Sequence, residues 1–187
     1  DVTKYGAAGD GVTLCTDAFR QAIAACHAAG GGRVVVPAGR FLTGAIHLKS
    51  RVNLHVSDGA TLAFSRDPRH YLPVVFTRWE GVELMNYSAL IYAFEQESIA
   101  VTGPGTLDGQ ADDTHWWPWK GQSKPATLEN QNVARAKLIE MGAAGVPVAE
   151  RAFGEGCSLR PNFIQPYRCT NVPIDGVTIV NSPMWEI

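Results

Sequence analysis

One short segment places a side chain that binds carboxylates next to a large flat aromatic ring. Arg78, Trp79 and Glu80 are consecutive and precede Gly81. An arginine guanidinium can bind a carboxylate through two parallel hydrogen bonds, so this segment is a candidate site for an acidic ligand. A surface ion pair between Arg78 and Glu80, of little energetic consequence, is the competing interpretation. The residues by themselves favour neither.

Two further residues complete the set of candidate binding residues. Arg160 precedes a proline and a strand-like stretch, where it can bind a carboxylate or tie the preceding segment down by hydrogen bonds. The second role is favoured. Trp185 follows a turn at residues 181–183 and is either a stacking residue on the floor of a cleft or an inward-facing core residue. The predicted binding residues are therefore Arg78, Trp79, Glu80, Arg160 and Trp185.

The densest aromatic cluster is residues 115–120, which read His-Trp-Trp-Pro-Trp-Lys. Indole faces can stack on sugar rings while Lys120 lies near a carboxylate. Large aromatic side chains, however, also dominate packing energetics. We therefore expect Trp116 and Trp117 to anchor a loop onto the body of the protein.

Other classes of chemistry lack their residue patterns. No metal-ligand spacing connects the histidines, and the glycines at 9–11 and 103–105 lack the helix entry of a phosphate-binding loop. We predict no metal site and no cofactor. The net charge of −2 argues against a nucleic-acid partner, and no apolar run is long enough for a membrane span. The scattered histidines are His27, His47, His55, His70 and His115.

The elements that must position these side chains come from a motif that recurs along the chain. An alternating strand, a glycine turn and a second short strand are found at residues 52–62, 99–107 and 172–179. Apolar residues at every second position place one row of side chains inside and one outside. A unit of this kind cannot bury its inner row alone, so copies must stack on one another. We predict a coiled solenoid of strands.

Two segments depart from this pattern. Residues 16–30 contain an amphipathic helix, expected from about Asp17 to Ala29 with Thr16 as its N-cap, which would cover the open end of the core. Residues 110–158 lose the strand pattern and are predicted to be an insertion with a short helix at 127–141. Further short strands are expected at 2–5, 74–77 and 81–84.

The chain stops at Ile187, directly after a fresh copy of the motif. We expect inner-row residues such as Val177, Ile179 and Trp185 to be exposed there, and to be covered by self-association, a partner or further coils. The four cysteines are expected to be free buried thiols, with a disulfide between Cys157 and Cys169 as the alternative.

With these elements in place, the residues resemble a known family. Residues 2–13 and 30–39 resemble the opening of pectin-acting right-handed parallel β-helix enzymes. Residues 99–110, Arg160-Pro161 and residues 181–185 together resemble glycoside hydrolase family 28, the polygalacturonases and their relatives. The resemblance implies an all-β, pectin-lyase-like fold, a single-stranded right-handed parallel β-helix, of which residues 1–187 are the N-terminal part of one domain.

The resemblance also implies inverting hydrolysis of a galacturonic-acid-containing polysaccharide, with aspartates as general acid and base. The family takes these from an Asn-Thr-Asp motif and an Asp-Asp pair, and completes the site with Gly-His-Gly and Arg-Ile-Lys. None of these motifs is found here, since the single adjacent pair, Asp112-Asp113, lies in a loop. In family order the motifs follow the Asn-Ser-Pro turn. No catalytic residue is therefore assigned, because the aspartates are expected beyond residue 187.

From the resemblance we expect a pectic polysaccharide or oligogalacturonide as the partner and a secreted or periplasmic location. These 187 residues alone are expected to be inactive, which release of reducing sugar from polygalacturonate would refute. Two alternatives stay open. One is a non-catalytic carbohydrate-binding or tail-fibre-type module. The other is a pectate-lyase-like enzyme with Ca²⁺, which needs clustered acidic ligands.

Overall fold

Three parallel sheets make up the body of the protein in the computed structural model, which describes residues 1–121 and 130–187. Sheet A has the order β1 (Asp10–Leu14), β3 (Gly39–Thr43), β6 (Ala60–Phe64), β11 (Thr106–Asp108) and β14 (Thr178–Val180). Sheet B has the order β13 (Ile174–Asp175), β10 (Ala100–Thr102), β5 (Val52–Val56) and β2 (Gly32–Val36). Sheet C has the order β12 (Ile164–Tyr167), β9 (Ile91–Phe94) and β4 (Ile46–His47).

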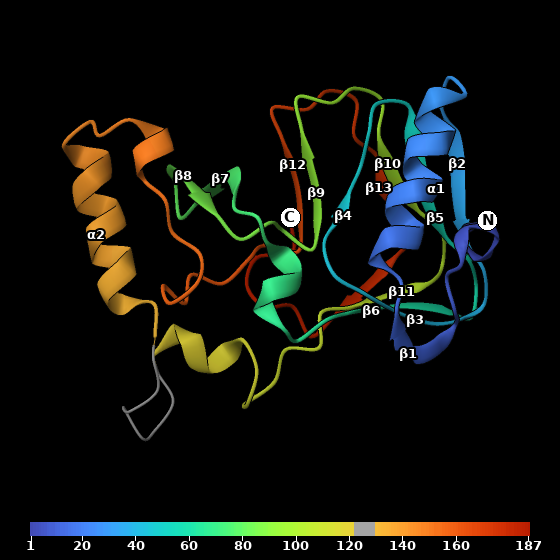
Figure 1. Ribbon diagram of the computed structural model, residues 1–187, viewed down its shortest axis with the longest axis horizontal. Coiled ribbons are helices and arrows are strands. Elements are labelled where there is room, and N and C mark those ends of the chain that lie inside the picture. The colour runs from blue at the N-terminus through green and yellow to red at the C-terminus, as the bar shows by residue number, and fades with distance from the viewer. Residues whose placement is uncertain (122–129) are drawn as a thin grey trace.

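The chain visits the three sheets in a fixed rotation. It passes from β2 to β3 to β4, and then to β5, β6 and, after an excursion, β9. Each circuit adds one strand to each sheet, which is the path of a coil (Figure 1). The predicted parallel β-helix is confirmed.

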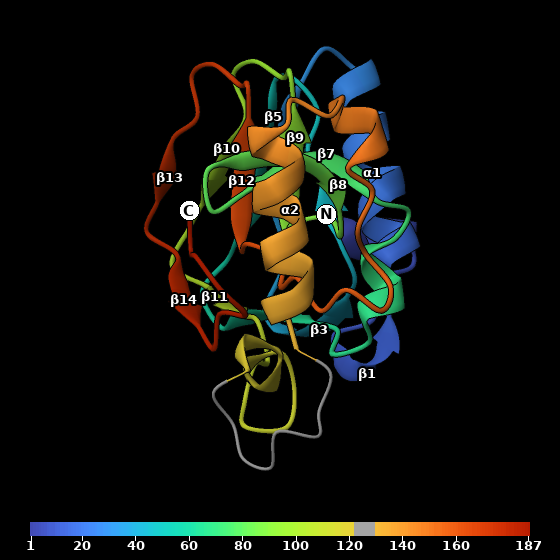
Figure 2. The same cartoon turned by 90° about the vertical axis from the view of Figure 1, so that its left-hand side faces the viewer.

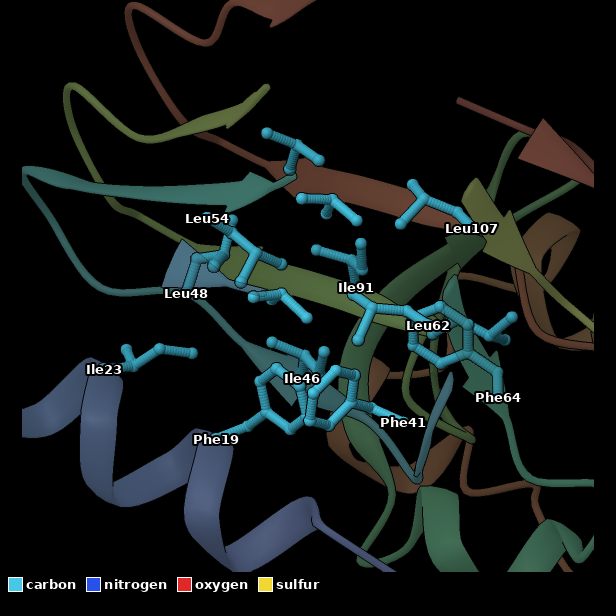
Figure 3. Close-up of a cluster of buried hydrophobic side chains, with 14 of the residues drawn as sticks. Phe19, Ile23, Phe41, Ile46, Leu48, Leu54, Leu62, Phe64, Ile91 and Leu107 are labelled. Atoms are coloured by element: carbon cyan, nitrogen blue, oxygen red, sulfur yellow. The ribbon is translucent and has the colours of Figure 1, made fainter. Parts of the chain in front are cut away.

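The core is built from inward-facing residues that repeat at the same place on each rung. In sheet A, Leu62 pairs in register with Phe41 on one side and Leu107 on the other, and in sheet B Leu54 pairs with Val34 and Val101. Figure 3 shows Leu54, Leu62, Leu107 and Ile91 converging from different sheets on one interior. Full burial of each such side chain is worth about 1.5–3 kcal/mol.

The N-terminal residues differ from the expectation. Val2–Tyr5 forms a 3₁₀ helix, so the predicted strand is wrong. The Asp1 carboxylate accepts a hydrogen bond from the Thr3 N–H at 2.9 Å, and Gly6 ends the turn in a left-handed conformation. These local interactions close a turn that the alternating pattern does not reveal.

Helix α1 (Thr16–Ala28) begins one residue earlier than expected. Thr16 does not cap it: its hydroxyl accepts a hydrogen bond from the Gly44 N–H at 2.7 Å, and Cys15 occupies the N-cap position. Phe19 and Ile23 point from α1 into the core near Phe41 and Ile46 (Figure 3).

The strands expected at 74–77 and 81–84 exist but do not join the coil. They are β7 (Val75–Trp79) and β8 (Val82–Asn86), an antiparallel hairpin. Helix α2 (Asn132–Ala143) packs against β8, and the two lie together beside the coil (Figure 1). Residues 127–129 of the helix predicted at 127–141 lie outside the described residues. The hairpin and α2 share a second core of Trp79, Leu84, Ala134, Leu138, Phe153 and Leu159.

The hairpin rests on the outer face of sheet C. The hydroxyl of Tyr92 on β9 donates to the Phe76 carbonyl, and the Phe76 ring lies 5.3 Å from the rings of Phe94 and Tyr167. The Arg168 guanidinium lies 5.0 Å from the centre of the Phe76 ring. These contacts fix strand β7 of the hairpin relative to the coil.

The aromatic loop behaves partly as expected. Trp116 is buried and makes edge contacts with Tyr71 and Trp119, so its predicted anchoring role is confirmed. Trp117 is 42% exposed, and it anchors the loop through a hydrogen bond from its indole N–H to the Ser182 carbonyl at 3.0 Å instead of through burial. Short 3₁₀ helices occur at η2 (Pro68–Tyr71), η3 (Trp117–Lys120) and η4 (Val148–Glu150). The four cysteines are free, although Cys15 alone is fully buried.

Asp108, at the end of β11, gives the fold a measurable dependence on acid. Burial by itself raises the pKa of this carboxyl, but hydrogen bonds from Asn181, from the Gln110 N–H and from Arg40 lower it to below its usual value. A carboxyl whose pKa is lower in the folded state stabilises the fold above its unfolded pKa, near 4. That stability is lost as the pH falls through the folded pKa.

Asp108→Asn is therefore expected to lower the free energy of unfolding at pH 7 by about 1 kcal/mol and to flatten its decline below about pH 4. Urea unfolding of both forms between pH 7 and pH 3 measures this. Parallel curves for the two forms over the acid range would contradict the assignment.

Candidate substrate-binding groove

A groove of about 790 Å³ lies where the hairpin turn, α2, β12 and the last residues of the chain meet. Figure 2 looks onto this side, with α2 in front of the hairpin and β12 beside them. Three of the predicted binding residues border it: Arg78, Glu80 and Trp185. The structure thus brings together side chains that are more than 100 residues apart in the sequence.

Arg78 makes no ion pair with any described residue, although its charge acts on Glu83, which stands opposite it across the hairpin. Its Nε donates to the Gly81 carbonyl at 3.2 Å. Among the described residues, no carboxylate oxygen lies within 4.0 Å of its guanidinium nitrogens, the distance that defines an ion pair. Glu80 instead binds Arg135 of α2, with 2.6 Å between Oε2 and Nε. The competing interpretation of an Arg78–Glu80 pair is therefore wrong, and the Arg78 guanidinium is available to an anion.

The backbone of Arg78 is held from sheet C. Its carbonyl accepts hydrogen bonds from the side-chain amides of Gln165, at 3.0 Å, and Asn162, at 3.4 Å. Both amides come from β12 or the residues just before it, and both border the groove. These bonds orient the segment that carries Arg78.

Trp79 and Arg160 lie beneath the groove. They are 3% and 8% exposed, and the Trp79 indole N–H donates to the Arg160 carbonyl at 3.1 Å. The Arg160 guanidinium donates to Gln131 Oε1 at 3.2 Å and to the Pro183 carbonyl at 2.8 Å. Arg160 therefore holds the neighbouring segments together by hydrogen bonds, which is the role that the sequence favours. Trp79 is part of the same buried layer beneath the groove.

Trp185 is 61% exposed, which agrees with the exposure expected of it at the open end of the coil. The carbonyls of Trp185 and Glu186 accept hydrogen bonds from the N–H groups of Phe163 and Ile164, at 2.8 and 3.0 Å. The backbone here runs beside β12 as the next rung of sheet C would, which places the indole at the edge of the groove.

Three polar residues of the groove are not among those predicted from the sequence: Arg135, Asn162 and Gln165. Arg135 was expected only as part of a helix, and its contact with Glu80 spans 55 residues, which no local pattern reports. Gln165 carries a weak signal, since a polar residue in a strand-like stretch marks the outward row.

The groove carries an arginine without an ion-pair partner but lacks a pair of free carboxylates among its described lining residues. Of its described lining residues only Glu80 is acidic, and that side chain is paired with Arg135. No three His, Cys, Asp or Glu side chains among residues 1–121 and 130–187 gather as a metal site would require. Within the same residues, no helix combines the length and the apolar character of a membrane span.

Comparison with known proteins places this groove in context. No protein-family model matches the chain. The chain is 39% identical over 117 residues to an exo-poly-alpha-D-galacturonosidase of Dickeya chrysanthemi, a match that covers 58% of this chain and 19% of that protein.

Two solved structures share the fold. An exopolygalacturonase from Thermotoga maritima, described as hyperthermoactive, superposes with a TM-score of 0.94 at 53% identity, over 98% of this chain and 42% of that one. A family 28 exopolygalacturonase from Yersinia enterocolitica gives 0.65 at 26% identity, over 98% and 35%. The chain spans less than half the length of each of these three relatives.

The likeness covers almost every residue of the coil, the hairpin and the groove wall, and the fold is the right-handed β-helix of pectin-lyase-like polygalacturonases. Sequence, fold and relatives agree, and the chain is related in sequence and fold to part of the polygalacturonases of glycoside hydrolase family 28.

Proposed function

We propose that the protein hydrolyses glycosidic bonds in galacturonic-acid-containing pectic polysaccharide, and that residues 1–187 supply its scaffold and one wall of the substrate groove. The observation that carries this proposal is the Arg78 guanidinium, which faces the groove without a carboxylate partner among the described residues. A uronic acid presents the carboxylate that this group binds best. The polygalacturonase relatives support the same substrate class.

The proposed binding mode uses two groups with different chemistry. The Arg78 guanidinium binds the carboxylate of one galacturonate, and the exposed Trp185 indole stacks on the apolar face of a sugar ring. Gln165 and Asn162 hold the Arg78 carbonyl. Part of the entropic cost of ordering the site is therefore met before the substrate arrives.

The chemical step is proposed to follow the inverting mechanism, in which one carboxylic acid protonates the leaving oxygen and a carboxylate activates water. The two carboxyls stand roughly 6.5–9.5 Å apart in such enzymes. The aspartate motifs of the family are not found in residues 1–187, and Glu80 is paired with Arg135, so we propose that both catalytic aspartates lie beyond residue 187. The inactivity of these residues alone stays a prediction.

Three finer features belong to this proposal. Helix α1 caps the coil, supported by the burial of Phe19 and Ile23 in the core. Residues 110–158 form the insertion that walls the groove, supported by the Arg135–Glu80 contact. The protein acts in a secreted or periplasmic compartment, because a plant-wall polysaccharide is met outside the cytoplasm. Association at the open end of the coil stays a prediction.

The binding role of Arg78 is tested by titrating trigalacturonate into the protein and into Arg78→Gln, by calorimetry or NMR. Loss of a charge-assisted bidentate contact is expected to weaken binding about tenfold, or about 1.4 kcal/mol. Arg20→Gln is the matched control, because Arg20 lies on α1 in an exposed pair with Asp17. The proposal would be wrong if Arg78→Gln bound trigalacturonate as tightly as the unchanged protein does. It would also be wrong if the unchanged protein bound a neutral galactose trimer as tightly as trigalacturonate.

A further inference from the structure

A second groove, of about 420 Å³, lies on the other flank of Arg78. It is bordered by the hairpin turn and β8, by Gly142 near the end of α2, by Tyr167 at the end of β12, and by Arg151. Its charged lining residues are Arg78, Glu83 and Arg151. The groove is therefore polar, and its character depends on which of these charges is already neutralised.

Glu83 is neutralised from the side of the coil. Its carboxylate accepts hydrogen bonds from the Tyr167 hydroxyl and from Arg168 Nη2, the latter at 3.1 Å. These two contacts lower the pKa of Glu83 from its usual value, and the nearby charges of Arg168 and Arg78 lower it further. Although Glu83 stands opposite Arg78 across the hairpin, its negative charge is shared with Arg168.

Arg151 is fixed in place but not neutralised. Its Nε donates to the Val146 carbonyl at 2.6 Å and its Nη1 to the Glu83 carbonyl at 3.1 Å. Both acceptors are backbone oxygens, and the described part of the chain offers Arg151 no carboxylate within 4.0 Å. Two guanidinium groups, those of Arg78 and Arg151, thus border one groove without a carboxylate of their own.

The two grooves meet at the hairpin turn. Arg78 and Gly81 border both of them, so the Arg78 side chain stands between the two spaces. At Gly81 even an added Cβ would meet no atom within 4 Å. An extended chain molecule can therefore cross the turn from the first groove to the second without meeting a side chain at that position.

We propose that the second groove binds a further carboxylate-bearing sugar of the same acidic polysaccharide, through Arg151. This inference rests on the proposed function, because it extends a chain that Arg78 already holds. Successive carboxylates of one polyuronate then contact Arg78 and Arg151. The second contact becomes intramolecular once the first is made, so affinity rises with the length of the oligomer.

The experiment measures affinity for mono-, tri- and hexagalacturonate. The unchanged protein is expected to bind hexagalacturonate at least tenfold more tightly than the monomer. Arg151→Gln is expected to lose most of this gain while its affinity for the monomer stays the same. If Arg151→Gln keeps the full gain, the inference is wrong. If Arg78→Gln binds every oligomer as well as the unchanged protein does, the proposed function itself fails.

Because Arg151 also holds two backbone carbonyls, two more variants keep the test decisive if Arg151→Gln does not fold. Arg151→Lys retains the charge and is expected to keep most of the gain with oligomer length. Val82 borders the second groove and not the first. Val82→Glu therefore places a carboxylate in the second groove alone. Val82 also packs against the core shared by the hairpin and α2, so unchanged affinity for the monomer must show that the hairpin stays in place. Val82→Glu is then expected to lose the gain with oligomer length, and retention of the gain would overturn the inference.

Discussion

Gly103→Ala is expected to destabilise the protein by about 3 kcal/mol or more, although the change adds a single methyl group. Gly103 lies in the turn between β10 and β11 with a φ of +106°, which L-residues rarely adopt. A Cβ there would also come within 2.2 Å of the Val56 carbonyl oxygen on the rung below. Adjacent rungs lie only about 4.8 Å apart, so the backbone cannot yield without separating two strands.

Gly6→Ala is the matched control. Gly6 has a similar φ of +93°, but a Cβ there would meet nothing within 4 Å. The control carries the backbone strain alone, at a cost of about 1–2 kcal/mol. Urea unfolding of both variants separates the two contributions. Equal losses of stability would show that close approach between rungs does not constrain the turn.

The same turn shows why the coil can be predicted from the sequence. The recurring copies at residues 52–62, 99–107 and 172–179 contain β5 and β6, then β10 and β11, then β13 and β14. Alternation within a strand and glycine in a turn are both visible in a short stretch of sequence. Alternation reflects the row of side chains buried against the neighbouring rungs, and glycine reflects the close approach of the turn to the neighbouring rung. The glycine position recurs at Gly176, where a Cβ would lie 3.0 Å from the Gly103 carbonyl oxygen.

The features that sequence could not predict depend on contacts between distant residues. Strands at 74–77 and 81–84 were expected, but nothing in their alternation distinguishes a rung of the coil from a hairpin laid over sheet C. The Thr16 hydroxyl could cap the helix, yet it accepts its hydrogen bond from the N–H of Gly44, 28 residues away. The pattern of a segment fixes its local conformation and leaves its partners undetermined.

The groove, too, could be predicted from the sequence only in part. Arg78, Glu80 and Trp185 were predicted from residue type, and all three border it. The pairing of Glu80 with Arg135, which leaves Arg78 without a carboxylate partner in the described chain, required the three-dimensional arrangement. Residue type also proposed Trp79 and Arg160, but type alone could not separate a side chain that faces the groove from one that supports it.

Trp79→Ala is expected to abolish trigalacturonate binding although the indole is only 3% exposed. The ring fills the core shared by the hairpin and α2, beside Leu84 and Leu138, and truncating a buried tryptophan costs about 3–5 kcal/mol. The hairpin then loses its fixed position, and Arg78 with it. Circular dichroism should still report the strands of the coil, because their core is a separate cluster.

Trp79→Phe separates support from contact. Phenylalanine keeps most of the packing and loses the hydrogen bond from the indole N–H to the Arg160 carbonyl, at a cost of about 1–2 kcal/mol. Binding should then stay close to that of the unchanged protein. A tryptophan that touched the sugar directly would give the opposite result, with weaker binding in Trp79→Ala at unchanged stability. A supporting tryptophan links the loss of binding to a loss of stability, whereas a tryptophan that contacts the sugar does not. Measuring both binding affinity and the free energy of unfolding for the two variants therefore assigns Trp79 to one of these roles.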